Sequence, residues 1–316
     1  MKMKKVLLTV VAGAMMFTAV GFGGSAAQAA TTPKQVEVLL NTVKMKFPDA
    51  KPFQDGQGSV MVPIRFVSEA LGAKVTYSKT GKVSKVGIKS KNHTVDMTIG
   101  QTTAIVDGQK KDYGTQIILK QNRTFVPLRL VSEGLGQKVE WDKIGRWVWI
   151  GNKEFRSTDD KEFKVKPLSD FKAYGKSNYV FNNIKDEKFN GIKVIKESDL
   201  PLRLANGQVI YSLELVQRTA GNYIQIRSSQ RGTTIQLLVK NEFSKGRSHV
   251  ENAFVNNRDQ TGLNFYPEIS STDKFQNRKY IDGYDYTKFK FSQADYILFS
   301  AAELDDYGVA IVNPFK

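Results

Sequence analysis

Alternating hydrophobic and polar residues dominate the second half of the chain and predict a strand-rich domain. Val209–Leu215 and Tyr223–Ser229 alternate on either side of a turn, and Thr233–Lys240 would add a third strand to this meander. Residues 248–255 are expected to form a short helix. Further strands are expected at 262–269, 288–292, 296–301 and 309–312. The pattern predicts an antiparallel β-rich domain, either a sandwich or an α+β fold.

The first half contains an internal repeat in which strand and helix periods follow one another. Residues 62–77 and 126–141 are identical at ten of sixteen positions, at an offset of 64 residues. In each copy a strand leads into a proline, which suits the first position of a helix because its missing N–H has no helical partner there. Gly72 and Gly136 supply the left-handed residue that ends each helix. Since a hairpin follows each helix, we expect two strand–helix–hairpin repeats.

Together these patterns predict an α+β chain in which strands dominate. Residues 30–153 are expected to form the repeat domain. A charged segment that is poor in aliphatic residues, 154–176, is expected to be a linker. Residues 177–316 would then form the β-rich domain, to which the patterns assign no function.

The first 29 residues have the features of a secretory signal peptide. Lys2, Lys4 and Lys5 precede an uncharged apolar run, and the small residues around Gln28 predict cleavage between Ala29 and Ala30. An uncleaved anchor is the alternative, but the apolar run is short and is broken by glycines. No later stretch is long enough to span a membrane. We therefore expect a secreted protein, either released or associated with the cell wall.

The amino-acid composition further restricts the kinds of functional site that the chain can form. The chain has no cysteine and two histidines. Disulfides, thiol catalysis and three-histidine metal sites within one chain are therefore excluded, and no cofactor or metal is expected. An exported protein without cysteine fits a Gram-positive origin.

Positive charge is concentrated in the first half of the chain. The net charge is +16, of which three lysines belong to the expected signal peptide. Residues 30–153 hold 20 basic and 10 acidic residues, whereas residues 154–316 hold 24 and 21. Such a domain would be attracted to an anionic cell-wall polymer or another anionic envelope surface. Nucleic acid is not the usual partner outside the cell and is not expected. The alternative is that the charge only aids solubility.

The repeated motif resembles a known family. The twin segments Val-Pro-Ile/Leu-Arg-x-Val-Ser-Glu-x-Leu-Gly are accompanied by residues 98–100, 106–108 and 139–142. Together they resemble the copper amine oxidase N-terminal-like domain, also called the stalk domain, over residues 35–151. The resemblance implies an appended, non-catalytic module of strands with short helices. The oxidase's copper site needs three histidines, and this chain has only His93 and His249, so it is not expected to be an amine oxidase.

The second half offers one cluster of candidate contact residues and no catalytic signature. Tyr280, Tyr284 and Tyr286 surround a glycine turn, where tyrosines could stack on sugar rings or anchor a protein partner. Alternatively, some of them belong to the core of a hairpin. Paired acids such as Asp305-Asp306 are adjacent in sequence and cannot flank a sugar bond from both sides.

Two classes of function remain open from the sequence. The first is an exported, non-catalytic envelope protein that uses the basic domain as a spacer or wall contact and the second domain for a partner. The second is a cell-wall or polysaccharide-directed enzyme with its catalytic site in the C-terminal domain.

Overall fold

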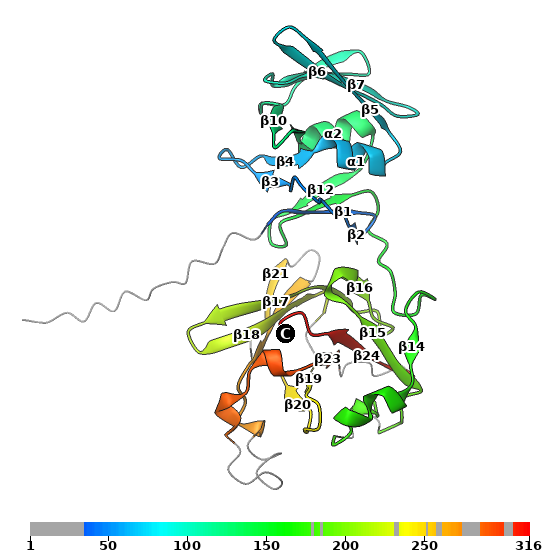
Figure 1. Ribbon diagram of the computed structural model, residues 1–316, viewed down its shortest axis with the longest axis vertical. Helices are drawn as coiled ribbons and strands as arrows, with labels where there is room; N and C mark the ends of the chain where they lie inside the picture. The colour runs from blue at the N-terminus through cyan, green and yellow to red at the C-terminus, as the bar shows by residue number, and fades with distance from the viewer. Residues whose placement is uncertain are drawn as a thin grey trace, which may run out of the picture. The chain divides into compact units, whose positions relative to one another are not determined.

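The computed structural model describes residues 35–177, 180–183, 186–230, 234–250, 252–256, 261–273, 285–299 and 306–316. The expected signal peptide, including Ala29 and Ala30, lies outside these residues. Strands prevail over short helices throughout the described chain (Figure 1), which confirms the strand-dominated α+β class.

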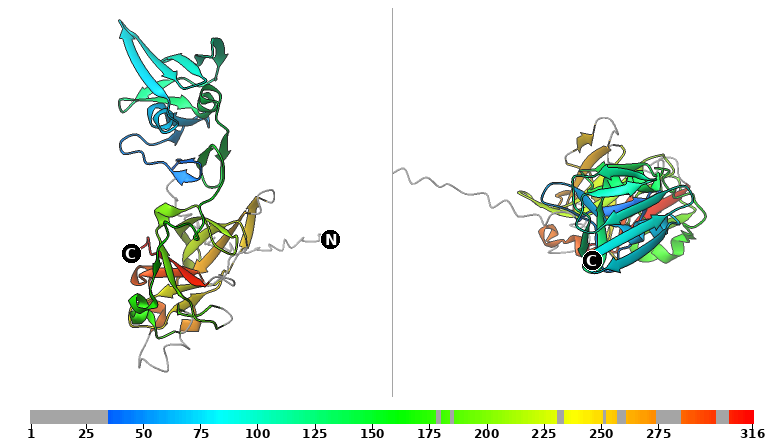
Figure 2. Two further views of the ribbon diagram at one scale, coloured as in Figure 1. Left: turned by 90° about the vertical axis from the view of Figure 1, so that its right-hand side faces the viewer. Right: turned by 90° about the horizontal axis from the view of Figure 1, so that it is seen from above.

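The described part of the first half, from residue 35 onward, is built from short strands and two α-helices, α1 (Ile64–Ala70) and α2 (Leu128–Leu135). One sheet runs in the order β12 (Val139–Asp142), β13 (Trp147–Ile150), β1 (Glu37–Leu40), β2 (Val43–Lys44). A second runs in the order β10 (Ile118–Lys120), β11 (Arg123–Pro127), β4 (Val60–Pro63), β3 (Phe53–Gln54). A third runs in chain order: β5 (Lys74–Thr80), β6 (Val83–Lys89), β7 (Thr94–Thr98), β8 (Thr103–Val106), β9 (Gln109–Asp112). Figure 2 shows the long β5–β6 hairpin at the edge of this half, on the side away from β1 and β2.

The two copies of the repeat meet through their equivalent residues. β4 and β11 pair antiparallel, and Val62 lies directly opposite Val126, which occupies the same position in the second copy. Equivalent residues can face each other in this way only when a two-fold axis relates the copies locally. Pro63 ends β4 in an extended conformation and α1 begins at the next residue, so the proline stands one position before the helix and not first within it.

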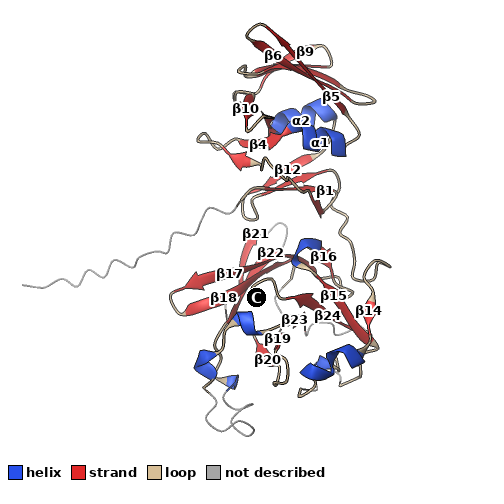
Figure 3. Ribbon diagram, viewed as in Figure 1, coloured by secondary structure: helices blue, strands red, loops and turns tan. Residues whose placement is uncertain are grey.

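The helices lie between the β5–β9 sheet and the other sheets of this half (Figure 3). Val67 of α1 and Val131 of α2 are fully buried in the same apolar core as Val86 and Val95 of the β5–β9 sheet. The glycine that follows each helix, at positions 72 and 136, has a positive φ, of 74° and 63° respectively. Both helix ends are therefore as the sequence predicts.

The second half forms two sheets that share an apolar core. The first sheet runs in the order β14 (Val165–Lys166), β15 (Gly191–Ile195), β24 (Tyr307–Val312), β23 (Tyr296–Phe299), β19 (Ile235–Leu238), β20 (Lys245–Arg247). The second runs in the order β16 (Leu202–Arg203), β17 (Val209–Arg218), β18 (Gly221–Ser228), β22 (Thr261–Pro267), β21 (Asn252–Asn256). The 3-10 turns η1 (Leu168–Tyr174), η3 (Glu197–Asp199), η4 (Tyr286–Lys288) and η5 (Phe291–Gln293) are among the described elements that accompany them.

Three local predictions for this half are wrong. The expected third strand of the meander, β19, joins the other sheet between β23 and β20, because all four of its residues are buried and it needs cover on both faces. A helix is expected at 248–255, but strand β21 begins within this segment. The pairing of β21 with β22 overrides a weak helical pattern. The expected strand at 288–292 is replaced by η4 and η5, where the Glu268 carboxylate accepts a hydrogen bond from the Phe291 N–H.

The segment expected to be a linker, residues 154–176, is packed at two points. Phe171 in η1 is 1% exposed and lies in an apolar cluster on the β14–β20 sheet. The Phe155 ring lies against Trp149 of β13 and Tyr211 of β17, with ring centroids 6.0 and 5.6 Å away. Phe155 contacts each of these two rings edge-on, so this segment connects apolar groups from both halves of the chain.

Candidate functional site

The β5–β9 sheet has one buried face and one open face. Along β6, Val86 and Ile88 point into the core, so Lys85, Gly87 and Lys89 lie on the opposite, open face. The register between strands places further polar residues on that open face: Lys74, Thr76 and Ser78 of β5, Thr94, Asp96 and Thr98 of β7, Thr103 of β8 and Lys110 of β9. The open face is therefore rich in lysine and hydroxyl groups.

Residues 74–91 hold six lysines and no acidic residue. These lysines are Lys74, Lys79, Lys82, Lys85, Lys89 and Lys91. Within the part of the chain that the structure describes, none of the six forms an ion pair. Other basic residues of the first half do find acidic partners, as Lys111 does with Glu133 and Arg123 with Asp49. We call this segment with its open face the lysine hairpin.

A shallow hollow of about 350 Å³ lies at the centre of the open face. Gly87 is among its lining residues, and a Cβ there would lie 2.7 Å from the Thr76 hydroxyl oxygen. Lys85, Lys110 and Asp96 are among the residues that line it. Asp96 is the acid among the residues that line the hollow, and the lysine and hydroxyl donors outnumber it there.

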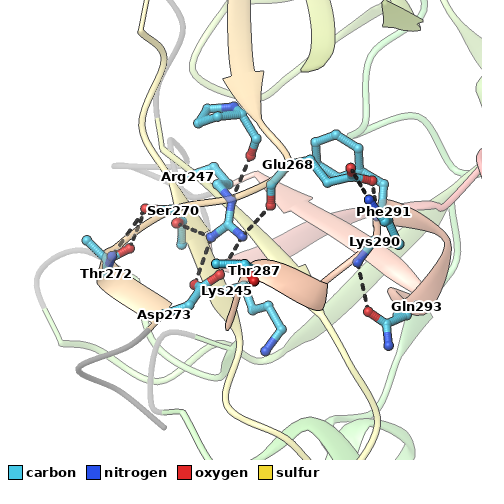
Figure 4. A network of polar contacts seen from close by, with 12 residues as sticks. Lys245, Arg247, Glu268, Ser270, Thr272, Asp273, Thr287, Lys290, Phe291 and Gln293 are labelled. Atoms are coloured by element: carbon cyan, nitrogen blue, oxygen red, sulfur yellow. Dashed lines mark hydrogen bonds and ion pairs between the residues drawn. The ribbon is translucent and has the colours of Figure 1, made fainter. Parts of the chain in front are cut away.

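A polar network in the second half surrounds Arg247 (Figure 4). Its guanidinium donates to both oxygens of Asp273, at 2.9 and 2.7 Å, and both side chains are fully buried. The remaining donors reach the backbone oxygens of Pro267, Gly246 and Glu268. All five guanidinium donors are therefore used inside the protein. The network fixes the chain where it leaves β22 and has no donor left for a ligand.

The candidate tyrosines are only partly covered by the structure. Tyr280 and Tyr284 lie outside the described residues. Tyr286 begins η4 and is half-buried, next to Asp285, whose carboxylate accepts from the Thr287 N–H at 3.1 Å. Binding of a sugar or protein through these tyrosines stays a prediction.

In two of the hollows that contain carboxylates, a lysine contacts an acid. In a cavity of about 330 Å³, Lys44 lies 2.8 Å from Glu197 and 3.5 Å from Glu37. In a larger, open hollow of about 740 Å³, Asp295 contacts Lys316 and accepts a 2.8 Å hydrogen bond from Tyr174. Burial alone would raise the pKa of Asp295, but the bonds from Lys316 and Tyr174 outweigh it and lower that pKa. A carboxyl held ionised in this way is not poised to act as a general acid at neutral pH.

No helix in the described part of the chain is long and apolar enough to cross a membrane. Among the same residues, no three His, Cys, Asp or Glu side chains are grouped so that they could hold a metal ion.

The fold of the first half therefore defines a strand-rich module with a duplicated core and one basic, open sheet face. Residues 39–150 match the family model of the copper amine oxidase N-terminal domain, which confirms the resemblance seen in the twin motifs. No curated protein matches the chain, and no solved structure does.

Sequence reasoning missed the lysine hairpin because it counted charge over whole domains. A count over a short window finds it, since six of the lysines lie within 18 residues without an acid. The strand register shows that these lysines belong to a sheet with a hydroxyl-rich face. A count of charges in a sequence window cannot show this.

Proposed function

We propose that this protein is an exported, non-catalytic binding protein of the cell envelope. The basic first domain contacts an anionic cell-wall polymer through the lysine hairpin and also acts as a spacer. The C-terminal domain binds a further envelope partner. The observation that carries this proposal is the run of six lysines without an acidic residue or an ion partner among the described residues.

The placement of these charges favours an extended anionic partner. Lysines on adjacent strands and along one strand form an open surface, and lysine ammonium groups bind phosphate and carboxylate as point charges. An aromatic platform for neutral sugars is not part of this face, whose outward residues are Lys, Thr, Ser, Asp, Gly, Val and Ile along β5–β9. Charge therefore provides the main attraction.

The state of the carboxylates favours binding over catalysis. In two of the hollows that contain acids, lysine side chains already contact them. The buried Arg247 and Asp273 satisfy one another in the interior. In the observed geometry these carboxylates and Arg247 stabilise the fold. A catalytic role is therefore the less favoured alternative.

The proposal is tested by co-sedimentation of a protein of residues 30–316 with purified, polymer-bearing cell wall at several salt concentrations. A triple variant, Lys74→Gln with Lys85→Gln and Lys89→Gln, should bind at least about tenfold more weakly at low salt, because each lysine near an anionic surface contributes about 1 kcal/mol. Binding should also fall as salt rises, since the screening length shrinks to about 8 Å at physiological ionic strength.

A second triple variant supplies a control with the same net charge. Lys161, Lys164 and Lys166 are exposed in the second half of the chain, and their change to Gln should leave binding nearly unaltered. Equal losses in the two triple variants, or binding that is indifferent to salt, would refute the role of the lysine hairpin. Release of soluble sugar from the wall would overturn the non-catalytic assignment.

A further inference from the structure

The second copy of the repeat has a carboxylate beside its lysines, which residues 74–91 of the lysine hairpin lack. Lys138 occupies the position of Lys74 at the same offset of 64, whereas Gly151 occupies the position of Lys89 opposite it, and Lys153 lies two residues beyond. There the carboxylate of Glu140 lies between the two lysines, 2.9 Å from Lys138 and 2.6 Å from Lys153. The hydrogen bonds from these lysines lower the pKa of Glu140. The carboxylate thus compensates both charges.

In the first copy the acid is replaced by a hydroxyl residue. Thr76 stands at the position of Glu140, and its hydroxyl donates to the Gly87 carbonyl oxygen at 3.3 Å. Lys74 remains, and it lies directly opposite Lys89 in the register of β5 and β6. Like charges in directly opposed positions destabilise a sheet. The hairpin itself does not require opposed lysines, because the second copy forms a similar hairpin with Gly151 opposite Lys138.

We propose that an anionic group of the bound polymer lies between Lys74 and Lys89, beside Thr76, and compensates Lys74 as the Glu140 carboxylate compensates Lys138 in the second copy. This inference rests on the proposed function and adds the residues that hold the polymer. The anion would contact the two ammonium groups and receive a hydrogen bond from the Thr76 hydroxyl, after that hydroxyl turns away from Gly87.

The chemistry of the face favours a phosphodiester polymer as the occupant. A phosphodiester has one negative charge and two free oxygens, so it can accept from two ammonium groups at once, as the Glu140 carboxylate does. Lysine together with Ser and Thr hydroxyls is the usual donor set for phosphate oxygens. Ser78 and Thr98 flank Lys85 on the same face, two residues further along their strands, where a second phosphate of the chain would lie.

The substitution Thr76→Glu tests this assignment because it gives the first copy its own carboxylate. Binding of the 30–316 protein to a soluble glycerol phosphate polymer is measured by calorimetry at low salt, beside thermal unfolding without polymer. Thr76→Glu should weaken binding about tenfold or more, since a charge-assisted hydrogen-bond position is lost. It should also raise the unfolding temperature, because the lysine pair is compensated.

Gln116→Glu is the matched control, since Gln116 is exposed in the same domain and the change in net charge is identical. It should change binding less than about twofold. If Gln116→Glu weakens binding as much as Thr76→Glu, the domain binds by net charge alone, so the assigned position is refuted while the proposed function stands. If Thr76→Glu binds like the wild type, the position is also refuted.

Three further ligands test the chemistry of the occupant. Polygalacturonate that binds more tightly than the phosphate polymer would overturn the phosphodiester assignment, as would tighter binding to vesicles of anionic lipid. Inorganic phosphate should compete only weakly, because it engages one position where the polymer engages several. A wild-type protein that binds neither the wall nor the phosphate polymer would refute the proposed function itself.

Discussion

Lys74 and Lys89 occupy directly opposed positions on the neighbouring strands β5 and β6. Because these like charges repel, we expect Lys74→Gln to stabilise the protein by about 0.5 kcal/mol at low salt, an effect typical of a cross-strand pair. The gain should shrink as salt rises, and urea unfolding at two ionic strengths measures it.

The second copy supplies the control for this prediction. Lys138 lies at the equivalent position but contacts Glu140, so Lys138→Gln should leave stability unchanged or lower it slightly. A stability gain of equal size in both variants would show that the opposed lysines are not its cause.

The buried ion pair of Arg247 and Asp273 should be indispensable to the C-terminal domain. Asp273→Asn should lower the free energy of unfolding by about 3 kcal/mol or more, because it leaves the guanidinium buried without its counter-charge. Asp285→Asn removes the partner of the exposed Lys288 and should cost less than about 0.5 kcal/mol. Denaturant unfolding of both variants tests the contrast, and similar costs for the two would contradict it.

The two halves of the described chain should unfold as a coupled unit. The Arg227 guanidinium donates to Asp142 of β12, and it lies over the rings of Trp147 and Tyr211. A double-mutant cycle with Arg227→Met and Asp142→Asn should give a coupling energy of about 1 kcal/mol or more. Additive single effects would show that the contact does not connect the halves energetically.

Stability should fall at alkaline pH through Tyr113. Burial, followed by the charge of Glu133, raises the pKa of its hydroxyl from 10.0 to about 12. Between these values the unfolded chain loses the proton and the folded chain keeps it. Stability therefore falls as the pH rises from about 10 to about 12. The Tyr113→Phe variant should show a smaller fall over this range in urea unfolding, and an identical fall would contradict the prediction.

The features that the sequence predicted correctly are those set by neighbouring residues. Each copy's proline, apolar helical positions and terminal glycine fix a strand, a short helix and a turn locally, and the structure has all of them. The matching 16-residue segments likewise revealed the family that residues 39–150 match. In the second half, alternation found β17 and β18, whose Leu213, Ile224 and Ile226 are buried in the shared apolar core.

Only the tertiary structure decided how these pieces pair. Val62 faces Val126 because two copies of a strand can bury their apolar residues by antiparallel association, and no local pattern specifies that partner. Asp273 meets Arg247 26 residues away, and such a buried pair forms only when the surrounding fold excludes water. The opposition of Lys74 and Lys89 likewise depends on the hairpin register, since a shift of one residue would place one of them on the other face of the sheet.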